Sequence, residues 1–291
     1  MGFQHSGDYQ EITVTSTEEI HQVIQDHKAY HAPLRPIASK REQSLMVFYR
    51  GQSDRDWDIT SSLSRANVQE EELLEHTSLA VPKGMDLFGT IAYIQHYSPG
   101  TRFIDFTTDP NVAIYFACSG KEDKDGALYI YTYAPHKADW YSAMVLSELV
   151  RVQDDELTVQ EFSEKLLKEY PEFKARFPDT EDLNGAIISF LDHGFMAIPD
   201  DESYAANLRM QRQRGCFYIC GVEFLKPLTS TARWFSRAGK NRFKPHSAVV
   251  PRELKNGHTL VKLIIPSRVK PVLLQQLSLC GITEEFLLPD Q

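Results

Sequence analysis

The order of apolar and polar residues predicts a chain of helices and strands without an internal repeat. Ser16-Thr17-Glu18-Glu19 forms a capping box, which predicts a helix through about Tyr30. An apolar run at 45–49 that ends in Arg-Gly predicts a strand with a sharp exit. Asp109 and Pro110 suit the cap and the first position of a helix. Alternation at 127–133 predicts another strand.

The same patterns place the remaining elements and give the fold class. Helices are expected at 69–79, 86–97, most of 158–193, 204–213, and from the cap Ser267 to Gly281. Strands are expected at 102–106, 195–198, 215–220 and 258–265, and loops at 229–257. We therefore expect an α+β fold with a helical N-terminal segment at 1–44. A single domain would follow at 45–291, with a helical insertion at about 154–193.

Composition favours a globular, soluble protein. Hydrophobic residues make up 42% of the chain and charged residues 24%. The first residues lack the features of a secretory signal, and no stretch approaches the roughly 20 apolar residues of a membrane span. The four cysteines are best interpreted as small buried residues in a reducing compartment. We expect a cytoplasmic protein with no membrane association and no bound metal.

The charge distribution contains one candidate surface for a polyanion. The net charge of −9 argues against a protein that coats nucleic acid. From Phe224 to Arg252, however, basic residues occur without any acidic one. The candidate nucleic-acid-binding residues are Arg233, Arg237, Arg242 and Lys244, with Trp234, Phe235 and Phe243 between them. An ordinary solvated loop explains the same pattern.

Tyr49-Arg50-Gly51-Gln52 is the first segment that could carry chemistry. An arginine at the end of a strand places its guanidinium at the rim of a sheet, where it suits phosphate or carboxylate oxygens. The following glycine would let the backbone approach a ligand closely. The alternative is an arginine paired with an acid to hold the strand in place.

Two later segments add polar groups. Residues 96–110 gather His96, Tyr97, Asp105, Thr107 and Thr108 around a loop, a strand and a helix start, as pocket linings do. Helix capping also explains the Thr-Thr-Asp-Pro run. Gln213 lies where a helix meets a strand, so its amide points into a cleft or onto the surface. Phosphate-loop, dinucleotide-fold, hydrolase-elbow and zinc-protease motifs are absent from the sequence.

Together these segments resemble the FRG domain family of bacteria and phages. The resemblance begins with Phe48-Tyr49-Arg50-Gly51-Gln52, Trp57 and 61–65. It continues through Gln95-His96-Tyr97, 101–107 and 110–117, and then through Arg209, Gln213, Gly215, Phe217 and 262–289. Its span of about 45–289 would make 45–291 an FRG domain. The chain departs from the family at Phe106, where a tryptophan is common, and at Ser98-Pro99-Gly100, where Gly-Leu-Pro is common.

The order of these parts also resembles the ADP-ribosyltransferase fold. That resemblance implies NAD as co-substrate, bound by Tyr49, Arg50, Gly51, Gln52, Tyr97 and Thr108. It implies catalytic roles for Arg50, Asp105, Thr107, Gln213 and His96, although Gln213 stands where an acidic residue is usual. The implied biology is a phage-defence toxin that modifies RNA or DNA and is held by an antitoxin.

Two other functions remain open at this point. One is a non-catalytic sensor that binds a nucleotide or a polyanion. The other is a nuclease-like hydrolase, which the lack of clustered carboxylates for a metal disfavours.

Overall fold

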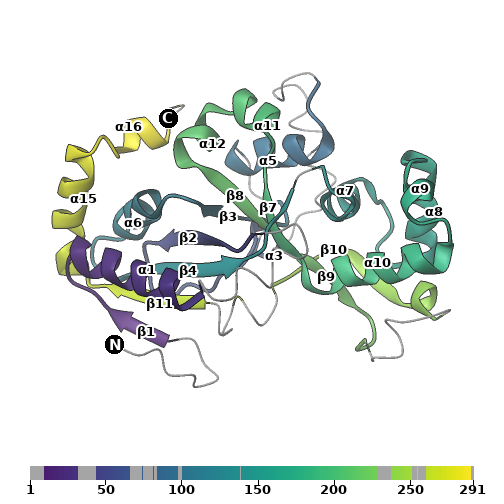
Figure 1. The fold of residues 1–291 in the computed structure, drawn as a ribbon, viewed down its shortest axis with the longest axis horizontal. Helices are drawn as coiled ribbons and strands as arrows, with labels where there is room; N and C mark the ends of the chain where they lie inside the picture. The colour runs from purple at the N-terminus through teal and green to yellow at the C-terminus, as the bar shows by residue number, and fades with distance from the viewer. Residues whose placement is uncertain are drawn as a thin grey trace.

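The computed structural model describes residues 10–31, 44–65, 84–97, 100–137, 139–228, 237–250 and 260–289, together with Leu74, Val81 and Leu254. Helices and strands are mixed along the chain, as the sequence predicts. Figure 1 shows a central sheet with helices gathered at both of its ends. The predicted helix at 69–79 lies almost wholly outside the described residues.

Within the described residues, the main sheet has eight strands in the order β1-β11-β4-β2-β3-β8-β7-β5. Its neighbours pair antiparallel except for β1 with β11 and β5 with β7, which are parallel. The strands are β1 (Gln10–Thr13), β11 (Leu260–Ile265), β4 (Gly126–Tyr133), β2 (Met46–Gln52), β3 (Phe103–Thr107), β8 (Gly215–Ile219), β7 (Phe195–Ile198) and β5 (His136–Lys137). A smaller sheet contains β6 (Leu157–Thr158), β10 (Arg242–Val249) and β9 (Gly221–Phe224).

Two groups of helices lie at the two ends of the main sheet, and the second also packs against the smaller sheet (Figure 1). One group comprises α1 (Thr17–His31), α6 (Pro110–Cys118), α15 (Lys270–Leu279) and α16 (Glu284–Leu287). The other comprises α5 (Leu87–Tyr97), α7 (Tyr141–Glu148), α8 (Val159–Glu169), α9 (Phe173–Arg176), α10 (Thr180–His193), α11 (Asp201–Ala206) and α12 (Leu208–Gln213). Short helical pieces are α3 (Ser62–Arg65), η2 (Leu149–Arg151), η3 (Ala238–Lys240) and η4 (Ser267–Val269).

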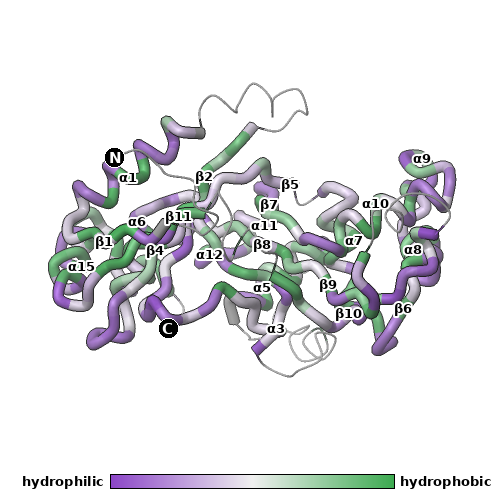
Figure 2. Tube along the Cα trace, turned by 90° about the horizontal axis from the view of Figure 1, so that it is seen from below, coloured by the Kyte–Doolittle hydropathy of each residue, from purple (hydrophilic) through white to green (hydrophobic). Residues whose placement is uncertain are grey.

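Apolar residues concentrate where these layers meet. Figure 2 shows hydrophobic residues along β2 and α5, whereas α1 and α9 at the two ends carry many hydrophilic residues. Ile20 and Ile24 of α1 are buried in the same cluster as Tyr49 and Leu128 of the sheet. The N-terminal segment also contributes β1 to the main sheet, so its packing is continuous with the rest of the fold.

Local signals explain most of the elements. Asp109 accepts a hydrogen bond from the backbone of Asn111 and Pro110 is the first residue of α6, as predicted. Ser16 accepts from the backbone of Glu19 and so caps α1 as predicted, while the Glu19 carboxylate accepts from the backbone of Thr15. Thr158 and Glu161 form a capping box at α8. Gly281 has a φ of 79° just after α15, as a residue beyond a helix end requires.

Three predictions about the elements are wrong in detail. The predicted helix at 204–213 is two helices, because Asn207 ends α11 and caps α12 through its side chain. The stretch 229–257 contains the strand β10 instead of loops alone. Ser267 begins η4 without a side-chain cap, and α15 starts only at Lys270.

Candidate functional site

Two neighbouring cavities lie at the carboxyl end of β2. The smaller, which we call the fork cavity, has a volume of about 240 Å³. The larger, the loop cavity, has a volume of about 890 Å³. They share Arg50, Gly51 and Phe116, so the strand-end arginine stands between them. The fork cavity is lined by Tyr49, Arg50, Gly51, Gln95, Asp105, Phe106, Thr107, Val112, Ala113, Phe116, Arg209 and Gln213.

The fork cavity forms where β2 and β3 separate. The two strands are in register only at Tyr49 and Thr107. Beyond this pair the Arg50 guanidinium crosses the gap, and its Nη1 donates to the backbone oxygen of Asp105 at 2.6 Å. Burial lowers the pKa of Arg50, while the nearby Asp105 carboxylate acts in the opposite direction. An arginine remains charged in either case, so the fork holds a fixed positive charge.

The Asp105 carboxylate is oriented by a short chain of hydrogen bonds. The Thr101 hydroxyl donates to Gln95 Oε1, which fixes the direction of that amide. Gln95 Nε2 then donates to Asp105 Oδ2 at 3.0 Å. The other carboxylate oxygen, Oδ1, is buried and has no hydrogen-bond partner among the described residues. One acceptor of Asp105 is therefore left over beside the cavity.

Two unsatisfied donors accompany this acceptor. The Tyr49 hydroxyl and Arg50 Nε are buried without a hydrogen-bond partner among the described residues. Burial, helped by the negative charge of Asp109, raises the pKa of Tyr49 to about 12, so the phenol keeps its proton at neutral pH. Buried polar groups almost always find partners in folded proteins. Three leftover groups around one cavity therefore indicate a place for a polar ligand or for ordered water.

Thr107 and Gln213 line the fork cavity, but their polar groups are engaged elsewhere. The Thr107 hydroxyl donates to the backbone oxygen of Gln213 at 2.6 Å and accepts from the backbone of Asp109 at 3.0 Å. Gln213 Nε2 donates to the backbone oxygen of Leu287 at 3.0 Å. These contacts tie β3 to α12, and α12 to α16. Both side chains hold the wall in place.

Gly51 has a packing role, which corrects the expectation that it opens the backbone to a ligand. A Cβ at this position would lie 1.9 Å from the Ala113 oxygen and 2.6 Å from the Ala117 nitrogen, both in the backbone of α6. Its own backbone lies opposite Leu128 of β4. The close approach that requires glycine is therefore made by a helix.

The other predicted cofactor residues are dispersed. Gln52 lies in the loop cavity, where its Nε2 donates to the Asp58 backbone oxygen at 3.3 Å. Thr108 is bonded through its backbone to Arg214 and is not part of either cavity wall. His96 and Tyr97 end α5, next to Gln95, and their side chains lie outside the described part of the structure.

The predicted basic surface lies on the smaller sheet, and two of its charges are paired. Arg242 is 3.1 Å from Glu156, and Lys244 is 3.1 Å from Glu223. Arg237 is exposed beside η3, and Arg233 lies outside the described residues. In Figure 1, β9 and β10 lie near α10, at the opposite end of the molecule from α6. The structure thus does not bring Arg237, Arg242 or Lys244 to the fork cavity.

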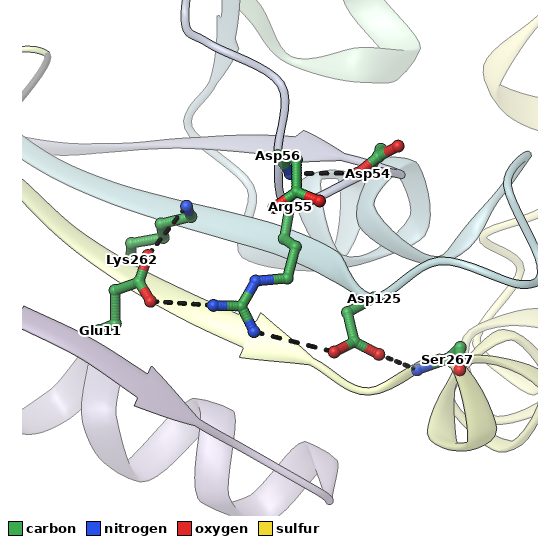
Figure 3. Close-up of polar contacts among 7 residues, drawn as sticks. All are labelled: Glu11, Asp54, Arg55, Asp56, Asp125, Lys262 and Ser267. Atoms are coloured by element: carbon green, nitrogen blue, oxygen red, sulfur yellow. Dashed lines mark hydrogen bonds and ion pairs between the residues drawn. The ribbon is translucent and has the colours of Figure 1, made fainter.

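The wall of the loop cavity is a turn held from two sides. Arg55 contacts Glu11 at 3.0 Å and Asp125 at 3.8 Å, a network shown in Figure 3. From beneath, the buried Lys270 donates to the backbone oxygens of Ser53 at 2.7 Å and Lys121 at 2.8 Å. Burial lowers the pKa of Lys270, and nearby acidic groups oppose that shift. The turn after β2 is therefore anchored to β1, to the residue before β4 and to α15.

Sequence reasoning missed several residues of the fork cavity. Gln95, Arg209 and Phe116 line it, yet none of them was predicted as a site residue. Each of them occurs in a segment that carries the FRG resemblance, and that resemblance is the sequence feature that could have identified them as site residues. Arg102 belongs to the same polar segment, 96–110, but it is fully buried and its Nη2 donates to the Pro245 oxygen at 2.6 Å. It fastens β10 to the main sheet.

The cysteines and acidic residues show no metal centre in the part of the chain that the structure describes. There, no group of three or more His, Cys, Asp or Glu side chains is arranged to hold a metal ion. Cys216 and Cys220 are buried in one apolar cluster with Phe106. In the same ranges, no helix is both long and apolar enough to cross a membrane.

Comparison with known proteins identifies one domain. No curated protein and no solved structure matches this chain. A family model, that of the FRG domain, matches residues 46–126, which run from the start of β2 to the start of β4 and include Arg50, Gln95, Asp105 and α6. The fork between β2 and β3 is thus the part of the fold that the family model covers, and the chain contains an FRG domain.

Proposed function

We propose that this protein is an ADP-ribosyltransferase that uses NAD and acts at the fork cavity. The observation that carries the proposal is the meeting of a strand-end arginine, a protonated tyrosine and an oriented carboxylate around one cavity. The three segments that resemble ADP-ribosyltransferases come from β2, β3 and the α12–β8 junction. These strands are neighbours in the sheet, as a shared site requires.

The leftover polar atoms suit NAD. Arg50 Nε is a charged donor for a pyrophosphate oxygen, and the Tyr49 hydroxyl is a neutral donor. Asp105 Oδ1 is an acceptor for a ribose hydroxyl. The fork cavity alone suits one half of a dinucleotide, and Arg50 also borders the loop cavity.

When bound, NAD supplies an ADP-ribose group whose bond to nicotinamide breaks as a bond to the acceptor forms. Nicotinamide leaves with the bonding electron pair, and the acceptor loses a proton. In this proposal the Asp105 carboxylate, held by Gln95, stabilises positive charge that develops on the ribose. Arg50 holds the phosphates in place. Asp109 or His96 would take the proton from the acceptor.

Gln213 does not supply the acidic group that ADP-ribosyltransferases usually have at this point. Its amide is committed to the Leu287 oxygen, so Asp105 is the carboxylate that we assign to the ribose. The presence of glutamine instead of an acidic residue at position 213 favours a second candidate function, a sensor that binds NAD without turning it over. Binding of NAD without release of nicotinamide would indicate the sensor.

The test uses NAD labelled on its adenylate phosphate, with single-stranded DNA, RNA and cell lysate as acceptors. Arg50→Ala should abolish transfer and weaken NAD binding, since the fork loses its charge. Asp105→Asn keeps the shape and the hydrogen bond from Gln95, so it should retain NAD binding and lose about 100-fold or more of the transfer rate. Arg268→Ala, an exposed charge on η4, is the matched control and should behave as wild type.

Full transfer activity in Arg50→Ala would remove the fork cavity from the mechanism. The proposed biology, a phage-defence toxin held by an antitoxin, is tested separately by expression in a bacterial host. Growth arrest that Asp105→Asn relieves would support it, and equal growth with both forms would contradict a toxic activity.

A further inference from the structure

The loop cavity has the chemistry of a second binding site beside the fork cavity. It meets the fork cavity at Arg50, Gly51 and Phe116, so a molecule in it would lie next to the proposed ADP-ribose donor. Its wall is the turn that Arg55 and Lys270 anchor, which indicates a pre-formed site (Figure 3). The inference drawn here rests on the proposed transferase and concerns the acceptor.

One side of the loop cavity offers a flat aromatic surface. Trp57 is 48% exposed although it is large and apolar, and it lies on the anchored turn. Exposed tryptophans on a fixed backbone are suited to stacking against planar rings. The Arg65 guanidinium is held at the same cavity by the backbone oxygen of Thr60 at 2.8 Å.

Beside the guanidiniums of Arg50 and Arg65, this cavity presents a group of hydrogen-bond acceptors. Asp56 and Asp58 contribute exposed carboxylates. Gln52 is 5% exposed, and its Oε1 has no hydrogen-bond partner among the described residues. Because Nε2 of the same amide donates to the Asp58 oxygen, the amide is held with Oε1 facing away from that contact. Carboxylate and amide oxygens match N–H donors and repel phosphates.

We infer that the loop cavity binds the acceptor as a nucleobase that carries an exocyclic amino group. Trp57 stacks on the base, and the oxygens of Gln52, Asp56 and Asp58 receive its N–H groups. Guanine, cytosine and adenine fit this arrangement better than thymine or uracil, which lack the amino group. Arg65 at the rim receives the adjoining phosphate. This site replaces β10 as the acceptor surface, since Arg242 and Lys244 are paired with glutamates.

The test measures binding of short fluorescent single strands, oligo(dC), oligo(dA) and oligo(dT), to the full chain by anisotropy. Trp57→Ala should weaken binding of oligo(dC) about 5- to 150-fold, the range that loss of one stacked base gives. Trp57→Phe should restore most of the affinity, because a ring remains. Oligo(dT) should bind more weakly than oligo(dC) to wild type. Arg242→Ala is the matched control and should bind as wild type.

Three outcomes overturn the inference. The first is unchanged oligonucleotide binding in Trp57→Ala. The second is equal affinity for oligo(dT) and oligo(dC). The third is an equal loss of NAD and oligonucleotide affinity in Trp57→Ala, measured by calorimetry, which would assign the cavity to the adenine of NAD. If wild type fails to bind NAD while oligonucleotide binding still depends on Trp57, the base site stands and the transferase proposal fails.

Discussion

Gln213 stands where the resemblance to ADP-ribosyltransferases implies an acidic catalytic residue, yet its side chain holds two helices together. Its amide nitrogen holds the Leu287 oxygen, so α12 is fastened to α16 at the wall of the fork cavity. Arg212 makes a parallel contact, since its Nη1 donates to the Phe286 oxygen at 3.0 Å. A carboxylate at position 213 would face a carbonyl oxygen, and two acceptors cannot bond each other.

Gln213→Glu should therefore not increase transfer, even though it restores the acidic residue that the resemblance to ADP-ribosyltransferases implies. It should lower the free energy of unfolding by about 1–3 kcal/mol, because a buried partner is lost. Urea denaturation and the transfer assay measure the two effects. Gln275→Glu, on the exposed side of α15, controls for the added charge. A rise in the transfer rate with Gln213→Glu would contradict this expectation and show that the Gln213 amide limits the rate of the wild-type protein.

His136 predicts how stability depends on pH. Its ring stacks on Phe195 at 4.3 Å and shares a hydrogen bond with Ser142 at 2.6 Å. Burial lowers the pKa of His136 from 6.5 to about 4, so folding favours the neutral ring. The resulting stability is complete above pH 6.5 and is lost as the pH falls from 6.5 towards 4.

The melting temperature of wild type should accordingly drop between pH 7 and pH 5 by more than that of His136→Phe. The phenyl ring keeps the stack and cannot take up a proton, while the lost bond to Ser142 is a penalty at every pH. Differential scanning calorimetry at the two pH values measures this. Parallel curves for the two proteins would mean that His136 does not titrate with folding.

Half of the residues that line the fork cavity could be predicted from the sequence, but their contacts could not. Arg50, Asp105, Thr107 and Gln213 line one cavity as expected, because a short strand and a helix start leave few positions for them. Gln95 was missed as the partner of Asp105, since a hydrogen bond between a helix and a strand leaves no periodic trace. The pairing of Lys244 with Glu223 could not be predicted either, because it depends on which strand lies beside β10.

Among the elements, α6 approaches the sheet unusually closely. Gly51 of β2 and Gly126 of β4 both face its backbone, and a Cβ on Gly126 would lie 2.1 Å from the Ala117 oxygen. Such a contact cannot accommodate a methyl group without moving the helix. The glycine of the Arg-Gly pair thus sets the depth of the cavity wall formed by Ala113 and Phe116.

Gly51→Ala should lower the free energy of unfolding by more than about 3 kcal/mol, because the overlap is with backbone atoms. Gly215→Ala is the control, since its nearest neighbour would be the flexible Met210 side chain at 3.2 Å. Thermal unfolding of the two purified variants compares them. Equal stability of Gly51→Ala and wild type would contradict the packing role. It would support the alternative that Gly51 lets the backbone approach a ligand closely.

The predicted helices and strands agree with the structure where residues close in sequence determine the element. They disagree where the element depends on residues far along the chain. Caps and apolar faces placed α1 and the start of α6 within a residue or two. By contrast, β10 contains Pro245 and few alternating apolar residues, and it is held by pairing with β9 and by Arg102. Strand β1 was likewise not expected, because its order comes from β11, far along the chain.

At the scale of the molecule, Lys270 joins the C-terminal helix α15 to the cavity wall. Lys270→Met should leave the oxygens of Ser53 and Lys121 without a donor and destabilise the fold by about 2–5 kcal/mol. It should also weaken oligonucleotide binding at the loop cavity, because the turn that carries Trp57 loses its support. Lys262→Met removes another lysine that contacts Glu11 and serves as the comparison. Oligonucleotide affinity equal to wild type in Lys270→Met would mean that the turn is held by Arg55 alone.

The hydrogen bond from Lys270 to Ser53 spans 217 positions of the chain. A ribosome adds residues one by one, at about 5–20 per second, and shields the newest ones. A nascent chain that has displayed the stretch matched by the FRG model, residues 46–126, still lacks α15 and the β11 partner of β1. The cavities therefore acquire their final walls only near the end of synthesis, so a half-made chain does not yet present either cavity in its finished form.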